Sequence, residues 1–402
     1  MTVLAETDAN RRDERRAMSV ASGAHALHDG YTDLIYVMLP IWQAEFALSF
    51  AAVGLLRGLF AGTMAALQIP AGHLSERYGA AAILAGGTAL AGFGYCLAGL
   101  SGGFGMLLVA LLVGGLGASA QHPIASALVA RAFSGARSLR ALGGYNFAGD
   151  IGKMTVPALA SLMLVVMPWR PALLVLGAAG FVAALLILLL TPRFAPIATS
   201  SPAKADTAKP VRSLRYAFPI LTSIGVIDSA TRMGFLTFLP FILTAKGASL
   251  PTIGMALTLV FAGGAVGKLV CAFIGARIGI IGTVFLTEIM TLALILLILP
   301  VPLEAALIIL PILGIALNGT SSVLYGSVPE LVAPEQRTRA FGIFYTGTIG
   351  AGAIAPILYG VITDAIGLTG GVIVVAALVV LTLPLALVLR PAFAQDQSPS
   401  AV

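Results

Sequence analysis

Residues 50–79 read FAAVGLLRGLFAGTMAALQIPAGHLSERYG, an apolar run followed by a short polar turn. A helix that crosses roughly 30 Å of hydrocarbon needs about 20 mainly apolar residues, and the run over 50–74 meets this requirement. Similar runs recur along the whole chain of 402 residues, of which 58% are hydrophobic and only 10% charged. Because soluble proteins carry about 25% charged residues, this composition excludes a cytosolic enzyme, a nucleic-acid-binding protein and a disordered scaffold.

Twelve apolar segments predict an all-α membrane protein with twelve transmembrane helices in two bundles of six. The segments cover residues 18–45, 50–74, 80–100, 103–131, 139–166, 171–191, 215–245, 251–275, 280–300, 303–328, 338–363 and 367–390. A polar stretch over 193–214, rich in Ser, Ala and Pro, is predicted to be a cytoplasmic linker between bundles at 18–192 and 215–390. Residues 1–17 and 391–402 are predicted to be cytoplasmic tails, and 1–17 lacks the apolar core of a cleaved signal peptide.

The distribution of Lys and Arg predicts the orientation, because cytoplasmic loops retain positive charge. With the N-terminus inside, seventeen of these residues fall on the cytoplasmic side, and only Arg170 and Lys246 fall on the outer side. An even number of helices then places both termini in the cytoplasm, in a bacterial-type inner membrane. The net charge of +6 therefore reflects topology and gives no reason to expect a nucleic-acid partner.

The two halves of the chain match each other at an offset of 199–201 residues. The matches keep the same order in both halves: Asp29 with Asp228, Phe60-Ala61-Gly62 with Phe261-Ala262-Gly263, Arg77 and Gly79 with Arg277 and Gly279, and Pro157 with Pro356. Parallel repeats with a site near the bilayer midplane are typical of secondary transporters. Some charges break the repeat, since Ile349 and Gly352 stand at the positions of Asp150 and Lys153. This asymmetry indicates a site that distinguishes one face of a substrate from the other.

The turn Gly72-His-Leu74-Ser-Glu76-Arg77-Tyr-Gly79 resembles the loop pattern G-x-L-x-D-R-x-G of the major facilitator superfamily, with Glu76 in place of the usual Asp. Two further stretches resemble the fosmidomycin-resistance branch of efflux transporters, namely His25-Ala-Leu-His28-Asp29 and Gly115-Leu-Gly117-Ala-Ser-Ala-Gln121-His122-Pro123. The resemblance implies a carrier that alternates between inward-facing and outward-facing states and is usually coupled to protons. It does not fix the substrate.

The same turn predicts a gate. A carboxylate and a guanidinium at a cytoplasmic helix junction can bridge to a neighbouring helix end in one state and release it in the other. We therefore predict a gating role for Gly72, Glu76, Arg77 and Gly79. The alternative is a pair of solvated loop charges that anchors the topology.

Ionisable side chains inside the apolar segments are the main candidates for a transport site, because each costs a few kcal/mol to place at mid-bilayer. Asp29, Asp150 and Asp228 each lie about a dozen residues from a segment boundary, which at about 1.5 Å per residue places them near the midplane. We expect the three carboxylates to line one water-filled cavity.

Asp29 and Asp33 form an i,i+4 pair on one helical face, with His25 on the same face and His28 beside it. Two close carboxylates cannot both ionise readily where the dielectric constant is low, and imidazole titrates near neutrality. These four residues are therefore predicted to couple transport to protons. The alternative for the two histidines is a packing role.

Lys153, Arg232 and Lys268 are predicted to bind an anionic substrate group, or to form internal ion pairs that open and close with the transport cycle. The predicted substrate-binding set is Asp150, Lys153, Asp228, Arg232, Lys268, His122, Asn146 and Tyr145. Two other charges are assigned elsewhere. Arg57 is expected to reach the membrane interface, and Glu288 to be a structural partner or to face lipid.

The predicted function is secondary active transport, with a proton-coupled antiporter that exports small polar or anionic organic compounds or drugs as the leading hypothesis. The alternatives are a proton-coupled importer or exchanger of a carboxylate-type anion, and an exporter of divalent metal ions, which Lys153 and Arg232 disfavour. The sequence has no signature of an enzyme, a metal centre or a cofactor site, and Cys96 and Cys271 give no disulfide framework. We expect a monomer in the lipid bilayer, powered by the proton gradient.

Overall fold

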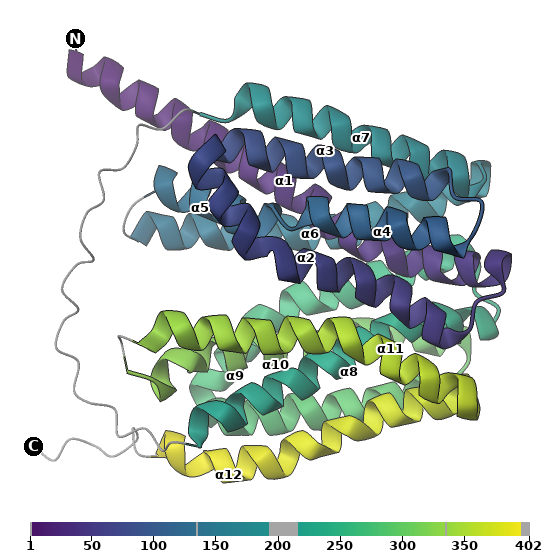
Figure 1. Cartoon of the computed structure of the whole chain (residues 1–402). Helices are drawn as coiled ribbons and strands as arrows, with labels where there is room; N and C mark the ends of the chain where they lie inside the picture. The colour runs from purple at the N-terminus through teal and green to yellow at the C-terminus, as the bar shows by residue number, and fades with distance from the viewer. Residues whose placement is uncertain (1, 134–135, 193–215, 334–335, 395–402) are drawn as a thin grey trace, which may run out of the picture. The chain divides into compact units, whose positions relative to one another are not determined.

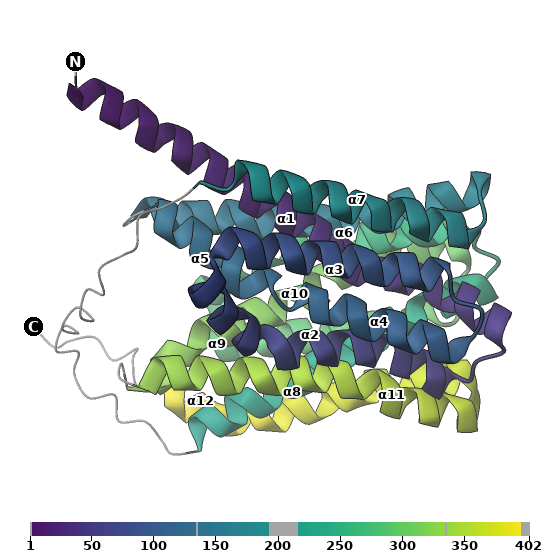
Figure 2. The same ribbon diagram turned by 45° about the horizontal axis from the view of Figure 1, so that its top comes forward.

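The computed structural model describes residues 2–133, 136–192, 216–333 and 336–394, and every regular element over these residues is a helix (Figures 1 and 2). The predicted linker over 193–214 and residues 395–402 of the predicted C-terminal tail lie outside the described residues. The helices form two compact units.

The first unit holds the N-terminal helices. These are α1 (Thr2–Phe46), α2 (Phe50–Tyr78), α3 (Ala80–Gly99), α4 (Phe104–Ala118), α5 (Gln121–Ala132), α6 (Ala136–Val166) and α7 (Trp169–Leu190). The unit includes α2 from Leu59 onward and also Ser249–Thr258 at the start of α9. Because α4 and α5 together make one crossing, the described part of this unit contributes the six predicted crossings.

The second unit holds α8 (Ala217–Ala245), α9 (Leu250–Ile298), α10 (Leu303–Leu331), α11 (Arg337–Leu378), the short 3₁₀ helix η2 (Val379–Leu381) and α12 (Thr382–Ala394). α9 and α11 are 49 and 42 residues long, about twice the length that one crossing needs. Each is interrupted by a glycine with non-helical backbone angles, Gly279 in α9 and Gly367 in α11. Each therefore contributes to two crossings, and the described part of this unit again has six.

The backbone conformation repeats between the two halves at a pair of glycines that the sequence repeat matches. Gly79 has φ of 92° between α2 and α3, and Gly279 has φ of 76° between the two parts of α9. Glycine adopts positive φ at little cost, whereas a side chain makes this conformation unfavourable. The matched glycines of the two halves thus make equivalent turns between equivalent helices.

The predicted segment 103–131 is two helices. α4 ends at Ala118 and α5 begins at Gln121, with Ser119 and Ala120 in a turn between them. Pro123 has no backbone N–H group and cannot donate a hydrogen bond to the carbonyl group of Ser119, four residues earlier. The restart of the helix places Gln121 and His122 in the first turn of α5.

α1 begins at Thr2, so residues 2–17 of the predicted tail form a helix that continues into the first crossing. An ion pair between Glu14 and Arg137 joins this extension to α6. Membrane crossings were predicted from hydrophobic runs, and a polar helix of this kind contains no such run.

In each unit one pair of helices has the most extensive contact: α1 with α6 in the first unit and α8 with α11 in the second. These pairs occupy equivalent places in the repeat. Separate apolar clusters complete the two cores, with Leu84 and Leu128 in the first and Leu221 and Leu324 in the second. The α1–α6 pair also positions the principal group of ionisable residues.

Candidate functional site

Small residues bring α1 and α6 close together around Asp29. A Cβ atom at Gly152 would meet the backbone carbonyl group of Ala26, and one at Gly149 would lie 2.6 Å from Asp29 Oδ2 and 2.8 Å from His25 Nε2. A side chain at either position would push the helices apart. Glycines in membrane helices commonly permit such close packing.

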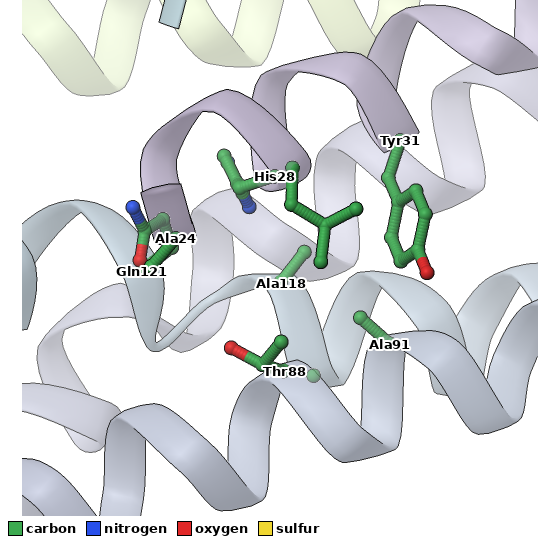
Figure 3. A pocket seen from close by; sticks show the side chains of 9 residues that line it. Ala24, His28, Tyr31, Thr88, Ala91, Ala118 and Gln121 are labelled. Carbon is green, nitrogen blue, oxygen red and sulfur yellow. The ribbon is translucent and has the colours of Figure 1, made fainter. Parts of the chain in front are cut away.

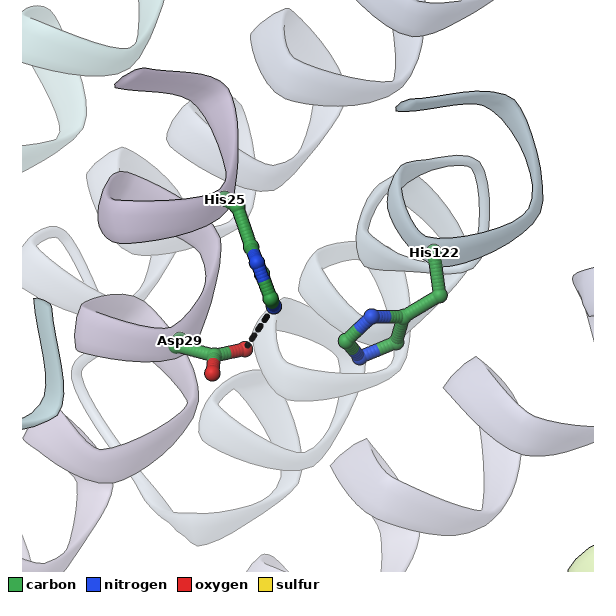
Figure 4. A group of neighbouring side chains, drawn as sticks. All are labelled: His25, Asp29 and His122. Carbon is green, nitrogen blue, oxygen red and sulfur yellow. Dashed lines mark ion pairs between the residues drawn. The ribbon is translucent and has the colours of Figure 1, made fainter. Parts of the chain in front are cut away.

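Around this contact lies a group that we call the Asp29 cluster, made of His25, His28 and Asp29 from α1, His122 from α5 and Lys153 from α6. Asp29 Oδ1 lies 3.4 Å from His25 Nε2 and 3.9 Å from His28 Nε2, and Asp29 Oδ2 lies 3.3 Å from Lys153 Nζ. Figure 4 shows the end of the His25 ring between Asp29 and His122, with the His25–Asp29 ion pair as a dashed line. The cluster gathers three of the four histidines in the chain.

The rings of the cluster pack against one another. The centroid of the His122 ring lies 5.3 Å from that of His25 and 4.7 Å from that of His28, in edge-to-face geometry. Tyr145 stacks on His25 with 4.1 Å between centroids. The break between α4 and α5 therefore has a direct effect, because it presents His122 to the two histidines of α1.

The hydrogen bonds of His25 locate a proton. His25 Nδ1 lies 2.9 Å from the backbone oxygen of Tyr145, and a carbonyl group can only accept, so Nδ1 carries a hydrogen. In the neutral ring Nε2 is then an acceptor that faces the Asp29 carboxylate. Both atoms are acceptors, so the contact is favourable when one of the two groups carries a further hydrogen. The predicted role of the pair in proton coupling stays a prediction.

Asp29 and Lys153 differ in access. The side chain of Asp29 is 9% exposed and that of Lys153 is 32% exposed, while Lys153 Nζ also lies 4.0 Å from Asp150 Oδ1. The ammonium group of Lys153 is therefore the more accessible of the two charged groups. The ligand atoms of His25, Asp29 and His122 lie within 4.8 Å of one another, close enough to share a metal ion. Lys153 would repel such a cation.

A small cavity of about 20 Å³ lies on the other side of His28, between α1, α3 and the α4–α5 break (Figure 3). Thr88, Tyr31 and Gln121 line it together with His28. Within the described part of the chain, His28 Nε2 and both amide atoms of Gln121 make no hydrogen bond. Four of the nine lining residues are polar, and a cavity of this size has room for about one water molecule. His28 borders this cavity and also lies near Asp29.

The second unit has its own polar group around Asp228. Arg232 Nη1 donates to Ser321 Oγ over 2.8 Å, and Ser321 Oγ donates to Asp228 Oδ2 over 2.8 Å. The serine thus connects the predicted charges of α8 through a residue of α10. Ser321 is not among the predicted site residues, although the repeat offset sets it opposite Gln121 and His122, the polar residues of the equivalent crossing.

Two charges assigned elsewhere are both buried. Glu288 lies near Asp228 and Arg232, which agrees with the predicted structural partner and not with the alternative of a lipid-facing residue. The prediction for Arg57 is wrong: this residue is buried, with Nη2 3.9 Å from Met233 Sδ, and does not extend to an exposed surface. Position along a helix gives the depth of a side chain but not its direction, and the error for Arg57 comes from that difference.

The other predicted site residues are distributed between the units. Tyr145 joins the Asp29 cluster through its ring and its carbonyl group, whereas the next residue, Asn146, is exposed. Asp33 is buried one turn beyond Asp29, and Lys268 is half-buried on α9. Asp29 and Asp150 belong to the first unit and Asp228 to the second. The cavity shared by all three carboxylates stays a prediction.

The predicted gate lies at the end of α2. Ser75 Oγ donates to the carbonyl group of Gly72 over 2.7 Å, and the Arg77 guanidinium lies 5.4 Å from the ring centroid of Tyr78. Glu76 is exposed and forms no ion pair with another described residue. The turn geometry of Gly79 fits a helix junction, and the gating role of these residues stays a prediction.

Comparison with known proteins identifies the fold and the family. Residues 21–227 and 221–401 match the family described as the Major Facilitator Superfamily. The fosmidomycin resistance protein of Escherichia coli K12 is 31% identical over 147 residues, which cover 37% of this chain and 36% of that protein. An MFS-type efflux pump of Mycolicibacterium smegmatis is 29% identical over 385 residues, which cover 90% and 88% of the two chains.

A solved structure shares the fold at low identity. It is the bacterial homologue of the human lysosomal transporter Spinster in its inward-facing, unoccupied conformation, with a TM-score of 0.78, 16% identity and coverage of 96% of this chain and 99% of that one. The predicted fold class, an all-helical membrane protein of the major facilitator type, is confirmed.

Proposed function

The chain belongs to the Major Facilitator Superfamily of transporters, and we propose that it is a proton-coupled antiporter that exports a small polar or anionic organic compound. In this proposal Asp29 carries the proton and Lys153 makes the first contact with the substrate. We place the multi-pass protein in a bacterial-type inner membrane with both termini in the cytoplasm. The name of the Mycolicibacterium smegmatis relative, an MFS-type efflux pump, supports the direction.

One observation carries the proposal: the Asp29 carboxylate faces His25 at one oxygen and Lys153 at the other. When a proton leaves the pair of His25 and Asp29, the carboxylate depends on its other partners, of which Lys153 is the positively charged one. In a cavity of low dielectric constant an unpaired charge is costly. We therefore expect Asp29 to alternate between two forms, one protonated and one ionised and stabilised by a positive or hydrogen-bond-donating partner.

Antiport follows if that partner is supplied by the substrate. A compound with a hydroxyl, amide or amine donor for Asp29, and an acceptor or anionic group for Lys153, would replace the direct ion pair between the two side chains. Such a compound and the proton compete for the same carboxylate. Exchange of the two across the membrane requires that the site binds either the proton or the substrate, but not both at once.

A second candidate is the proton-coupled import of a carboxylate-type anion, and the greater exposure of Lys153 favours it. A simple anion has no donor for Asp29 and would bind only the ammonium group. Protonation of Asp29 would then release Lys153 from its partner and strengthen anion binding. Proton and anion would bind together, which gives symport.

The sign of the proton linkage separates the two candidates. Titration calorimetry of the purified protein in two buffers with different ionisation enthalpies measures the protons released or taken up on binding. Antiport predicts proton release and an affinity that weakens as the pH falls, by up to about tenfold per pH unit for one coupled proton. Proton uptake, with tighter binding at low pH, would exclude antiport at this site.

Inverted vesicles with an acidic interior supply a direct test of direction. The panel contains a small phosphonate, a dicarboxylate, a zwitterionic amino acid and Zn²⁺. If the protein is an antiporting exporter, substrate accumulates inside the vesicles as protons leave them. If it is a proton–anion symporter, substrate accumulates inside only when the external medium is the more acidic side. Accumulation of Zn²⁺ alone would overturn the proposal of an organic substrate.

A further inference from the structure

A large groove lies between the start of α1 and the end of α7, outside the Asp29 cluster. Its volume is about 820 Å³, and both helices belong to the first unit. Figure 2 shows the two helices side by side at this end, with α1 continuing beyond α7. Four arginines and Ser19 line one part of the groove, and Gly23 and aliphatic residues of both helices line the rest.

The arginines occupy one face of α1. They are Arg11, Arg12, Arg15 and Arg16, all exposed. At about 3.6 residues per turn, successive residues are about 100° apart, so these four share one face and Asp13 and Glu14 lie on the other. The ion pair between Glu14 and Arg137 joins the acidic face to α6. Positive charge is thereby concentrated toward the groove.

The rest of the groove is apolar and open. Leu186 and Leu190, on one face of the last turns of α7, are 50% and 44% exposed. On α1, Gly23 has no atom within 4 Å of the position that a Cβ would take. A guanidinium group can donate two parallel hydrogen bonds to two phosphate oxygens. Free phosphate has no apolar part that could pack against aliphatic side chains. The combination matches a ligand with a phosphate headgroup and a hydrocarbon chain.

We propose that this groove binds an anionic phospholipid, with the headgroup phosphate on the arginines of α1 and an acyl chain along Leu186 and Leu190. Basic pockets beside membrane helices attract anionic headgroups through charge that adds up over several residues. The groove is separate from the Asp29 cluster, so lipid binding there does not depend on the proposed transport function.

The test uses the full-length protein in neutral detergent with short-chain phosphatidylglycerol or phosphatidylcholine as the probe. Retained lipid is counted by native mass spectrometry, and stabilisation is measured as the shift of the unfolding temperature. We expect the native chain to prefer phosphatidylglycerol by at least about tenfold, since four cationic side chains contribute. Equal retention of the two lipids would overturn the proposal.

Two variants test the two parts of the groove. Replacing Arg11, Arg12, Arg15 and Arg16 together by Gln is expected to remove the preference, and Gly23→Leu is expected to remove it by filling the apolar part without any change of charge. The matched control replaces four exposed arginines elsewhere, Arg140, Arg277, Arg339 and Arg390, and is expected to keep the preference.

Each remaining outcome decides against the groove. If Gly23→Leu keeps the preference while the arginine variant loses it, the arginines attract lipid only as surface charge. If the control loses it as well, net charge alone explains the result. If millimolar inorganic phosphate stabilises the native chain as much as phosphatidylglycerol does, the arginines form an anion site with no role for the apolar wall.

Discussion

Lys153 Nζ lies 3.3 Å from Asp29 Oδ2, where α6 packs against α1. The sequence separates these residues by more than a hundred positions, and the structure makes them partners in one cluster. Neutralisation of either side chain removes one charged partner of the other. Proton binding to Asp29 and substrate binding to Lys153 are therefore linked in the proposed mechanism.

Asp29→Asn is expected to abolish proton-driven transport while exchange of labelled for unlabelled substrate persists. The amide keeps the shape of the side chain but cannot take up and release a proton. Gradient-driven accumulation in inverted vesicles is expected to fall to the level of vesicles without the protein. Glu304→Gln, at an exposed carboxylate in the first turn of α10, is the control and is expected to transport normally. Full gradient-driven transport by the Asn variant would remove Asp29 from the proton pathway.

Gly149→Ala is expected to impair transport and to destabilise the protein by about 1–3 kcal/mol, the usual cost of overpacking. The added methyl group would occupy space that Asp29 and His25 already fill. Gly143→Ala is the matched control on the same helix, because its Cβ would meet nothing within 4 Å. Transport rates and unfolding temperatures of both variants check the prediction, and equal behaviour of the two would contradict it.

Gly279→Ala is expected to lower stability by about 1–3 kcal/mol, because non-glycine residues are strained in this backbone region. Its φ of 76° and ψ of 169° separate the two crossings of α9. Gly86→Ala adds the same methyl group to an open position of α3 and provides the comparison. The measurement is the unfolding temperature in detergent, and an unchanged value for Gly279→Ala would mean that the turn tolerates a side chain.

Ser321→Ala is expected to destabilise the second unit by about 1–3 kcal/mol, since it leaves buried charged groups without their hydroxyl partner. Ser321→Thr keeps the hydroxyl group and is expected to recover most of the loss. Ser327→Ala on the same helix removes a hydroxyl that, among the described residues, bonds to the carbonyl group of Val323 and to no charged group, and a smaller effect is expected there. Thermal unfolding of the three variants gives the comparison, and equal losses for Ser321→Ala and Ser327→Ala would show that the bridge contributes nothing specific.

Hydrophobic runs and the repeat were sufficient to predict the fold. Twelve runs of adequate length define the crossings, and the matched Gly79 and Gly279 make equivalent turns. The break between α4 and α5 was not predicted, although Pro123 explains it, because a proline can also be accommodated within a continuous membrane helix. The polar helix over residues 2–17 was missed since it has no apolar run.

The members of the candidate site were partly predictable. Charged residues in apolar segments identified Asp29 and Lys153, because such residues are costly unless they have a function. Their pairing across two helices was not predicted, since sequence gives the spacing along one helix only. Ser321 was missed for a related reason: a serine in a membrane helix is unremarkable until a neighbouring helix brings it between two charges.

Three of the four imidazole rings in this protein surround one carboxylate, and the fourth, His73, is exposed near the end of α2. Isotope labelling of histidine alone would therefore give a very simple magnetic resonance spectrum. One signal would report solvent, and three would report the surroundings of a single acid group. The signals of these three histidines would therefore change when the Asp29 carboxylate exchanges a bound proton for a substrate.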